Sequence, residues 1–509
     1  MRKQLFFMVV LMCCAMPNIA QDTIVFSDQF KFSRNTISYT ALPANDSKSY
    51  YSLEETAEKN SQLFIKNFSI DGKQQWTHSI EIPRIQDEEI DISEYHTLGD
   101  SILVFGTVVD HEANLKRAVV FSISNQGTTC SQPLLLGSID RESSSVLGVS
   151  FSPDSSKVLI YFDRTAPKKT DKDIPLRVYS RSFELIWEKA LELPYTNDVV
   201  QIHQYFVDNN GGLYLLSGKN PVKNIARQIK TQGGRYLVFY YNNVTNKLKE
   251  YDISLKDKQV VAALGIISPN NEMLIGGYYS RDYSFSVAGT FFFSITALGG
   301  AMKTATYMAF PKNFLDQMLS EREMERAAEI NDFYLDHIIY HNNTIMLVGE
   351  QFYITERVNT DINTGRAIVE NVYHYTDIIV TKLELTGKII WSNRIAKDQY
   401  SSTEYDRCSY NSYLINGNFT CVFNDHEDNT RILNNSPKGQ IESWNGTRVS
   451  TITIASIAEN GEQSRRTLAT EEQSEGSITP ELGSSEVYRL PVLGFTKGRD
   501  FRFATFFKK

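Results

Sequence analysis

The sequence predicts an all-β, seven-bladed β-propeller whose closing blade is formed from both ends of the chain. Two types of β-hairpin alternate along the 509 residues, and we count seven of each. The first type is an apolar strand, a glycine turn and a polar-aromatic strand, clearest in residues 63–76 and in the copy ending at Trp391. Alternating apolar positions around turn residues are typical of antiparallel strand pairs. Copies start roughly 55 to 60 residues apart as far as residue 310, as expected for repeated blades.

The second hairpin type fills the gaps between copies of the first. Its second strand often ends in glycine after an apolar run, at Gly106, Gly218, Gly276 and Gly349. Glycine weakens a strand, so its recurrence predicts places where neighbouring backbones approach closely. The series opens with a lone outer pair and closes with a lone inner pair, which predicts a blade shared by both ends of the chain. Such a closure removes open sheet edges. The alternatives are an open solenoid and a two-sheet sandwich.

Single hairpins are similar to those of known propellers. SPDSSKVLI, residues 152–160, resembles the S-P-D-G-x-x-[IL] hairpin of Tol-system and WD-type propellers. DGKQQW and TGKIIW resemble the G-x-x-x-W turn of quinoprotein-type propellers. Each resemblance covers one or two hairpins and implies a propeller repeat without identifying a family or a quinone cofactor. We therefore expect Trp76, Trp187 and Trp391 to be packing residues between blades.

The first twenty residues predict export. Arg2 and Lys3 precede an apolar stretch from Leu5 to Met16, and Ala20 offers a small residue for cleavage. This pattern describes a secretory signal peptide over residues 1–20. We expect residues 21–509 to form a single β-propeller domain in the periplasm, outside the cell or on its surface. No later segment has the roughly 20 uninterrupted apolar residues of a membrane helix, so no transmembrane segment is expected.

The charge of the predicted mature chain argues against a nucleic-acid partner. The whole chain has 52 basic and 60 acidic residues. Removing residues 1–20 takes away two basic residues and no acidic ones, which leaves 50 against 60, a net charge of −10. Binding to nucleic acid needs an excess of positive charge at the contact surface.

Three cysteines follow the predicted signal peptide: Cys130, Cys408 and Cys421. If Asn416 and Gly417 form a two-residue hairpin turn, Ile415 pairs with Asn418 and Cys421 faces Ser412. A Cys408–Cys421 disulfide would need a different strand register, because bridged cysteines have close Cα atoms. Free, buried thiols are the expected state.

The connections between strands indicate where a ligand would bind. Turns inside both hairpin types are short and rich in Asn, Gly, Asp and Ser, and propeller geometry places them on one side of the ring. Every long insertion is expected on the opposite side. These insertions are residues 219–235, 311–332, 355–377, 426–449 and 469–485. Long loops on a rigid scaffold often carry binding sites, so this side is the predicted functional face.

Several residues in these insertions are candidates for binding. Residues 311–330 predict one amphipathic helix, either a lid over the ring or a helix packed on its rim. The loop 219–235 carries basic residues and no acid, so Lys223 and Arg227 are candidates for an anionic ligand, although ordinary solvated charge would give the same pattern. Trp444 could stack on a sugar ring or cover a neighbouring blade. His374 and Arg431 complete the candidate ligand-binding residues.

A metal site is a weaker possibility. Asp425, Glu427 and Asp428 supply oxygen ligands of the kind calcium accepts, but the D-x-D-x-D-G spacing is missing. Calcium is therefore the one cofactor that the sequence suggests.

No catalytic signature is recognisable, and no catalytic residue is assigned. The chain lacks the G-x-S-x-G and H-E-x-x-H motifs. The sequence therefore favours a non-catalytic binding or scaffold module whose partner, another envelope protein, docks on the long-loop side. The alternative is a carbohydrate-binding protein or a carbohydrate-active enzyme of the glycosidase or lyase type.

Overall fold

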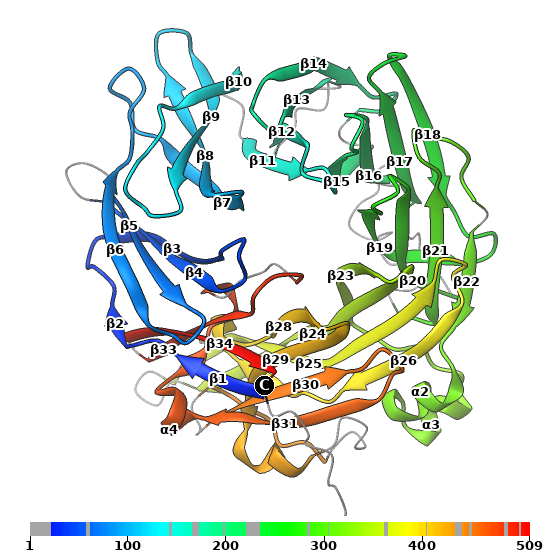
Figure 1. Cartoon of the computed structure of the whole chain (residues 1–509). Coiled ribbons are helices and arrows are strands. Elements are labelled where there is room, and N and C mark those ends of the chain that lie inside the picture. Colours follow the sequence, from blue (N-terminus) through cyan, green and yellow to red (C-terminus); the bar gives the residue numbers. More distant parts are fainter. Residues whose placement is uncertain are drawn as a thin grey trace, which may run out of the picture.

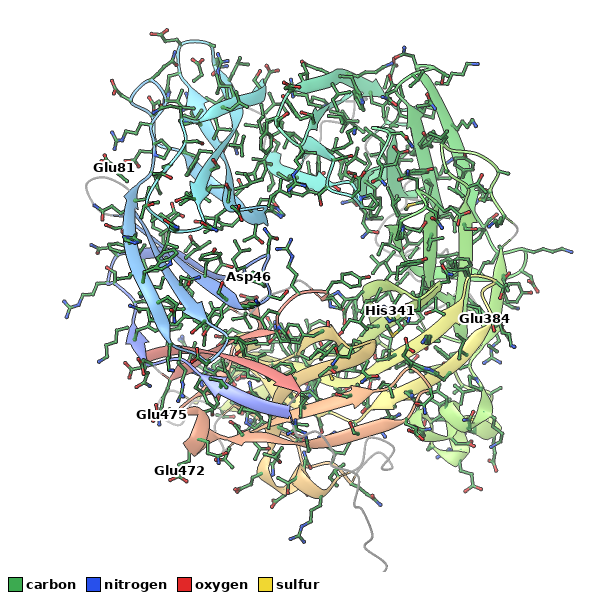
Figure 2. The ribbon with its side chains drawn as sticks, viewed as in Figure 1. Asp46, Glu81, His341, Glu384, Glu472 and Glu475 are labelled. Carbon is green, nitrogen blue, oxygen red and sulfur yellow. The ribbon has the colours of Figure 1, made fainter. Side chains whose placement is uncertain are left out.

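Eight antiparallel sheets form a closed ring around a central opening (Figure 1). The computed structural model describes residues 22–57, 62–141, 145–164, 173–196, 199–219, 235–281, 286–303, 305–360, 365–403, 405–432, 440–446, 450–482, 487–497 and 500–508. The predicted signal peptide lies outside the described residues. In blades 1 to 7 the first strand lies nearest the opening and the fourth lies outermost. Asp46 and His341, both beside inner hairpin turns, accordingly lie nearer the opening than Glu81, at the end of an outermost strand (Figure 2).

The first four blades follow one another without a break in this pattern. Blade 1 contains β3 (Thr36–Pro43), β4 (Ser49–Thr56), β5 (Gln62–Ser69) and β6 (Gln74–Glu81). Blade 2 contains β7 (Asp91–Leu98), β8 (Ser101–Asp110), β9 (Leu115–Ser124) and β10 (Leu134–Asp140). Blade 3 contains β11 (Ser145–Phe151), β12 (Lys157–Arg164), β13 (Asp173–Ser180) and β14 (Leu185–Glu192). Blade 4 contains β15 (Val200–Val207), β16 (Leu213–Lys219), β17 (Arg235–Asn242) and β18 (Lys247–Ile253).

The later blades carry longer strands and insertions. Blade 5 contains β19 (Gln259–Ile267), β20 (Met273–Ser280), β21 (Gly289–Ile295) and β22 (Thr306–Ala309). Blade 6 contains β23 (Phe333–His341), β24 (Thr344–Thr360), β25 (Ala367–Glu384) and β26 (Ile389–Ile395), and β27 (Gln399–Ser401) pairs with β25. Blade 7 contains β28 (Asn411–Ile415), β29 (Asn418–His426), β30 (Ser450–Ile457) and β31 (Gln463–Thr470).

Blade 8 closes the ring with strands from both ends of the chain, as predicted. Its order is β32 (Ser477–Ile478), β33 (Val492–Lys497), β34 (Asp500–Lys508) and β1 (Asp22–Phe26), with β2 (Phe30–Lys31) also on β34. Figure 1 shows β1 in blue beside β34 in red, and the register joins Thr23 to Phe507. Pairing β1 with β34 leaves the ring without a gap at its outer edge.

The predicted number of seven blades is wrong, because the hairpin of β3 and β4 was missed. These strands supply the inner half of blade 1, with Leu42 opposite Tyr51 and Thr40 opposite Leu53. Pro43, many hydroxyl-bearing residues and the absence of a glycine turn hide the hairpin in the sequence. Their tyrosine and leucine side chains are nevertheless buried, which completes the outer pair that the sequence left alone.

The recurrent glycines mark crowded places, as predicted. The inner strands β3, β7, β15, β19 and β23 each contain a register shift that leaves one residue unpaired. Gly106 and Gly349 lie opposite two of these bulges. A Cβ atom on Gly106 would lie 2.5 Å from the carbonyl oxygen of Asp91, and one on Gly349 would collide with that of Tyr334. A side chain does not fit there.

Three tryptophans pack from one blade onto the next, as predicted. The ring of Trp76 in blade 1 fills the place that a side chain at Gly127 of blade 2 would need. The indole of Trp187 donates a 2.9 Å hydrogen bond to the carbonyl of Gly211, and that of Trp391 donates one of 3.1 Å to Glu459. Each indole therefore lies on the turn of the following blade.

The cysteine prediction is confirmed for the hairpin register and for the buried Cys408 and Cys421, whereas Cys130 is only partly buried. Ile415 pairs with Asn418 and Ser412 with Cys421, and the turn residues Asn416 and Gly417 both have positive φ, 50° and 81°. Cys130, Cys408 and Cys421 are free cysteines. Burial raises the pKa of the Cys421 thiol to about 12.

The predicted helix over residues 311–330 is instead two short helices, α2 (Lys312–Met318) and α3 (Glu321–Glu325). Leu319 is extended, and Ser320 starts the second helix through a capping box with Glu323. Phe314 and Met318 are buried against Phe310 and Ile330. Both helices lie at the outer rim in Figure 1, so they do not cover the opening. No helix in the described ranges is long and apolar enough to cross a membrane.

Candidate functional site

The two sides of the ring differ as predicted, with one exception. Turns inside the hairpins lie on one side, called here the short-turn face, and the other connections lie on the opposite side, the long-loop face. The exception is the connection between β32 and β33 in blade 8, residues 479–491, which contains η3 (Pro480–Leu482). Since β32 and β33 are the two inner strands of their blade, this long connection belongs to the short-turn face.

On the long-loop face, β24 and β25 continue as a paired projection beyond the rest of their sheet. The insertion 355–377 was expected to be a loop, but residues 352–360 and 367–375 form a two-stranded arm, in which Val358 pairs with Val369 and Ile354 with Tyr373. Paired residues of antiparallel strands share a face, so these four side chains lie in one stripe, with the polar pair Glu356–Asn371 between the two apolar pairs. Ile354, Val358 and Val369 are 51%, 65% and 58% exposed.

His374 lies at the base of this arm. Its ring stacks on Tyr353 with centroids 4.5 Å apart, and its Nε2 lies 2.8 Å from the hydroxyl of Thr355. Burial lowers the pKa of His374, and the nearby Asp398 offsets part of this effect. The imidazole also stacks on Tyr400 of β27, with ring centroids 5.8 Å apart, and so helps to join the arm to β27.

Trp444 is fully buried, so its indole has no exposed face on which a sugar ring could stack. The backbone of Trp444 bridges Asp398 and Tyr400 by hydrogen bonds of 2.9 Å each. These bonds join the β29–β30 connection of blade 7 to blade 6, in agreement with the alternative that Trp444 covers a neighbouring blade. An isolated indole in a polar loop does not distinguish these two roles by sequence.

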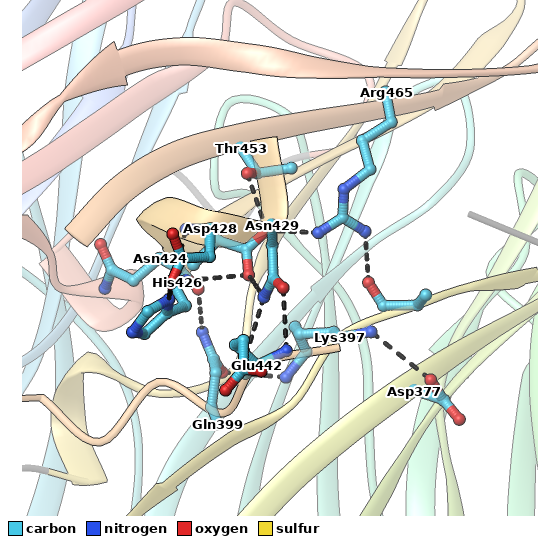
Figure 3. Close-up of polar contacts among 12 residues, drawn as sticks. Asp377, Lys397, Gln399, Asn424, His426, Asp428, Asn429, Glu442, Thr453 and Arg465 are labelled. Atoms are coloured by element: carbon cyan, nitrogen blue, oxygen red, sulfur yellow. Dashed lines mark hydrogen bonds and ion pairs between the residues drawn. The ribbon is translucent and has the colours of Figure 1, made fainter. Parts of the chain in front are cut away.

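The three predicted calcium ligands are not brought together. Asp425 is buried and accepts hydrogen bonds from Asn429 and Thr453, besides its ion pair with Arg465 (Figure 3). Glu427 and Asp428 belong to η2 (Glu427–Arg431) and are exposed. Among the described residues, no group of three His, Cys, Asp or Glu is placed to hold a metal ion. Asp425 is thus a structural anchor for the loop that follows it.

Of the other predicted ligand residues, the structure describes Arg431 and His374. Arg431 ends η2 and is exposed. Lys223 and Arg227 lie outside the described residues. Arg431 and His374 are therefore the predicted ligand residues that remain on the described long-loop face.

Buried ion pairs hold the base of this face in place. Lys397 lies 2.6 Å from Glu350, and Arg394 lies 2.8 Å from Asp377. Arg465 pairs with Asp425 and also donates to the carbonyl of Ala396, which links blade 7 to blade 6. Buried charges require such partners. The pairs fix residues 396–410 under the arm.

Asp336 is a titratable residue that the sequence analysis missed. It is the unpaired residue of the bulge in β23, and Tyr410 donates a 2.8 Å hydrogen bond to its carboxylate. Asp336 retains access to solvent, but surrounding protein desolvates the carboxyl group and Glu350 lies near, so its pKa rises to about 7. One acid within the apolar run FYLDHIIYH was the available signal.

A polar groove lies over blade 2, across the ring from the arm-bearing blade 6 (Figure 1). Its volume is about 950 Å³, and its lining comes from long-loop connections and the adjoining strand ends. Arg141 donates a 2.9 Å hydrogen bond to Nδ1 of His111, and Arg84 pairs with Glu89 at 2.5 Å. The charged members of the lining are Arg84, Asp87, Glu88, Glu89, Asp91, His111, Lys116 and Arg141. Both signs of charge are present in one open space.

Comparisons with known proteins identify no family. No protein-family model matches the chain, and no curated protein matches it. Among solved structures, the Dos1 propeller is 9% identical with a TM-score of 0.43, over 95% of each chain. The polysaccharide lyase Uly1 is 9% identical with a TM-score of 0.40, over 84% of this chain and 94% of that one. A periplasmic gluconolactonase of Pseudomonas aeruginosa, PpgL, is 11% identical with a TM-score of 0.32, over 70% and 84%. The chain is an eight-bladed β-propeller by its own sheet topology.

Proposed function

We propose that this chain is an exported, non-catalytic binding module that docks another envelope protein through the arm on its long-loop face. The observation that carries this proposal is the exposed stripe of Ile354, Val358 and Val369 on a rigid two-stranded arm. Apolar patches that project from a surface are typical of protein interaction sites.

The construction of the arm supports a docking role. Its residues exposed on both faces cannot stabilise the ring, because they contact little of it. Its base, in contrast, is fixed by the stack of His374 on Tyr400, by the pairing of β27 with β25 and by the ion pair of Lys397 with Glu350. A projection held rigidly at its base loses little conformational entropy when a partner binds it.

The arm also presents strand edges. Beyond Gln351, β24 has passed its last partner in β23, and β27 pairs with β25 only at Tyr373, His374 and Tyr375. A partner could therefore add a strand and contact the apolar stripe at the same time.

Capture by the immobilised mature protein tests the proposal. The wild type is compared with a Val358→Asp/Val369→Asp variant and with a Val244→Asp control, since Val244 is 82% exposed on a short turn. We expect a discrete envelope protein to be retained by the wild type and the control and reduced at least tenfold by the arm variant. Equal retention by all three proteins, or no retained protein, would contradict the proposal.

A carbohydrate ligand is the second candidate, and the polar groove over blade 2 favours it. A groove of about 950 Å³ with charged walls suits an oligosaccharide better than an apolar ligand. A ligand selective for the native state raises the melting temperature. We expect stabilisation by acidic or neutral oligosaccharides to be lost in Arg141→Ala and kept in Val358→Asp. A flat response across the panel would remove this candidate.

A further inference from the structure

A second cavity lies at the opposite side of the ring from the arm, near the central opening on the short-turn face. Its volume is about 380 Å³. Equivalent ends of four successive inner strands or their turns line it, from blades 3, 4, 5 and 6, including Phe151, Phe206, Ile266 and Tyr340. Tyr488, from the connection between β32 and β33, completes the wall.

The segment that carries Tyr488 is held across the inner ends of the blades. We call residues 487–491 the strap. The carbonyl of Val487 accepts a 2.7 Å hydrogen bond from the amide of Leu414 in blade 7. Arg489 donates to the hydroxyl of Thr97 in blade 2, at the other end of the strap. Anchors in two distant blades hold Tyr488 in position over the cavity.

The hydroxyl groups of Tyr488 and Tyr340 form hydrogen bonds with other polar groups of the protein. The hydroxyl of Tyr488 accepts a 2.9 Å hydrogen bond from the amide of Tyr340 and donates one of 3.1 Å to its carbonyl. The hydroxyl of Tyr340 itself donates to Asn343 at 2.7 Å. The aromatic rings therefore contribute carbon surface to the cavity while their hydroxyls are satisfied.

The chemistry of the lining determines which ligand fits. All nine lining residues are uncharged, and besides the two tyrosines they are phenylalanine, proline, valine and isoleucine. A charged or strongly hydrated ligand would lose water there without gaining hydrogen bonds. Flat rings gain stacking and edge contacts with such walls. The volume is at the small end of the range for ligand pockets, which suits a molecule of one or two rings.

We propose that this cavity is a binding site for a small, uncharged aromatic molecule. The site is independent of the arm, since it lies on the other face and shares no residue with it. Binding also joins the strap to blades 3 to 6, so it stabilises the strap in its place across the ring.

Fluorescence titration with N-phenyl-1-naphthylamine, a neutral aromatic probe, tests the site on the mature protein. We expect saturable binding of one probe per chain that indole displaces and glucose does not. Ile266→Glu places a charge in the cavity and should weaken binding at least tenfold. Tyr488→Ser removes one wall at a residue that is 56% exposed, so it should fold and weaken binding about threefold to tenfold.

Two matched results would overturn the site. Ile354→Asp on the arm is the control, and it should leave probe affinity unchanged. If Ile354→Asp abolishes binding while Tyr488→Ser and Ile266→Glu retain it, the probe binds the arm. If the wild type shows no saturable binding, the cavity holds no aromatic ligand. Neither result bears on envelope-protein capture, which is measured separately.

Discussion

Blades 4 and 5 meet through an apolar interface, whereas blades 6 and 7 enclose charges. Val238, Ile275 and Phe293 belong to one continuous apolar core between blades 4 and 5. Blades 6 and 7 also have an apolar core, but beside it lie the buried pairs Arg465–Asp425 and Lys397–Glu350. The charged region is the one that supports the arm and the β29–β30 connection. Apolar packing suffices to repeat a blade, while fixed polar contacts position the irregular segments added to it.

The largest expected effect is the loss of one buried charge from blade 7. Asp425→Ala leaves the guanidinium of Arg465, whose side chain is 2% exposed, without its carboxylate. We expect the free energy of unfolding to fall by about 3–5 kcal/mol, because an uncompensated charge remains buried. Urea denaturation measures this change. An Asp425→Leu/Arg465→Leu double variant should recover most of the loss, and equal losses in both variants would show that the pair does more than neutralise charge.

A glycine comparison between blades 6 and 5 should give a smaller effect. Gly349→Ala forces a methyl group against the carbonyl of Tyr334, whereas Gly276→Ala meets the ends of the Leu347 and Ile345 side chains. Backbone moves less readily than a side-chain terminus. We expect about 1–3 kcal/mol of destabilisation for Gly349→Ala and less for Gly276→Ala in the same urea experiment. The reverse order would contradict the crowding argument.

Asp336 in blade 6 should make the stability of the protein depend on pH. Its folded-state pKa of about 7 lies above the unfolded value of about 3.9. Between these values the folded chain holds a proton that the unfolded chain has lost, so this group's contribution lowers stability as pH rises from 4 to 7. Asp336→Asn should therefore raise the melting temperature, relative to the wild type, more at pH 8 than at pH 5. An equal difference at both pH values would contradict the raised pKa.

The smallest expected effect on stability is in the arm. Val358 and Val369 are more than half exposed, so Val358→Asp/Val369→Asp should change the free energy of unfolding by less than about 0.5 kcal/mol per substitution. Thermal unfolding checks this value beside the capture experiment. A large destabilisation would mean that the arm contributes to the stability of the ring, and it would contradict a docking role for the arm.

The repeated hairpins could be predicted because each carries its own local signal. The turn at Asn416 and Gly417 determines the strand register as far as Cys421. The positions of the tryptophans and glycines in the repeated hairpins predict where neighbouring blades and strands pack closely. The hairpin of β3 and β4 lacked those signals, which is why one blade was missed. Its burial depends on blades that are distant in sequence.

The candidate site was less predictable because its geometry is tertiary. The arm has polar residues between its apolar ones, so its sequence is also typical of a loop. Trp444 is held against Asp398 and Tyr400 of blade 6, and Asp425 is held by Thr453 and Arg465 of the next two strands of blade 7. No spacing within their own loop indicates these contacts. The environment of the Asp336 carboxyl group depends on a bulge and on Tyr410, which lies 74 residues away in the sequence.

The pairing of Phe26 with Ala504 in blade 8 has a consequence for how the molecule is made. β1 precedes the other described strands in the sequence and β34 follows them, so blade 8 cannot close until β34 has been synthesised. Closing so long a loop is slow. The ring would thus remain open until β34 is available to pair with β1.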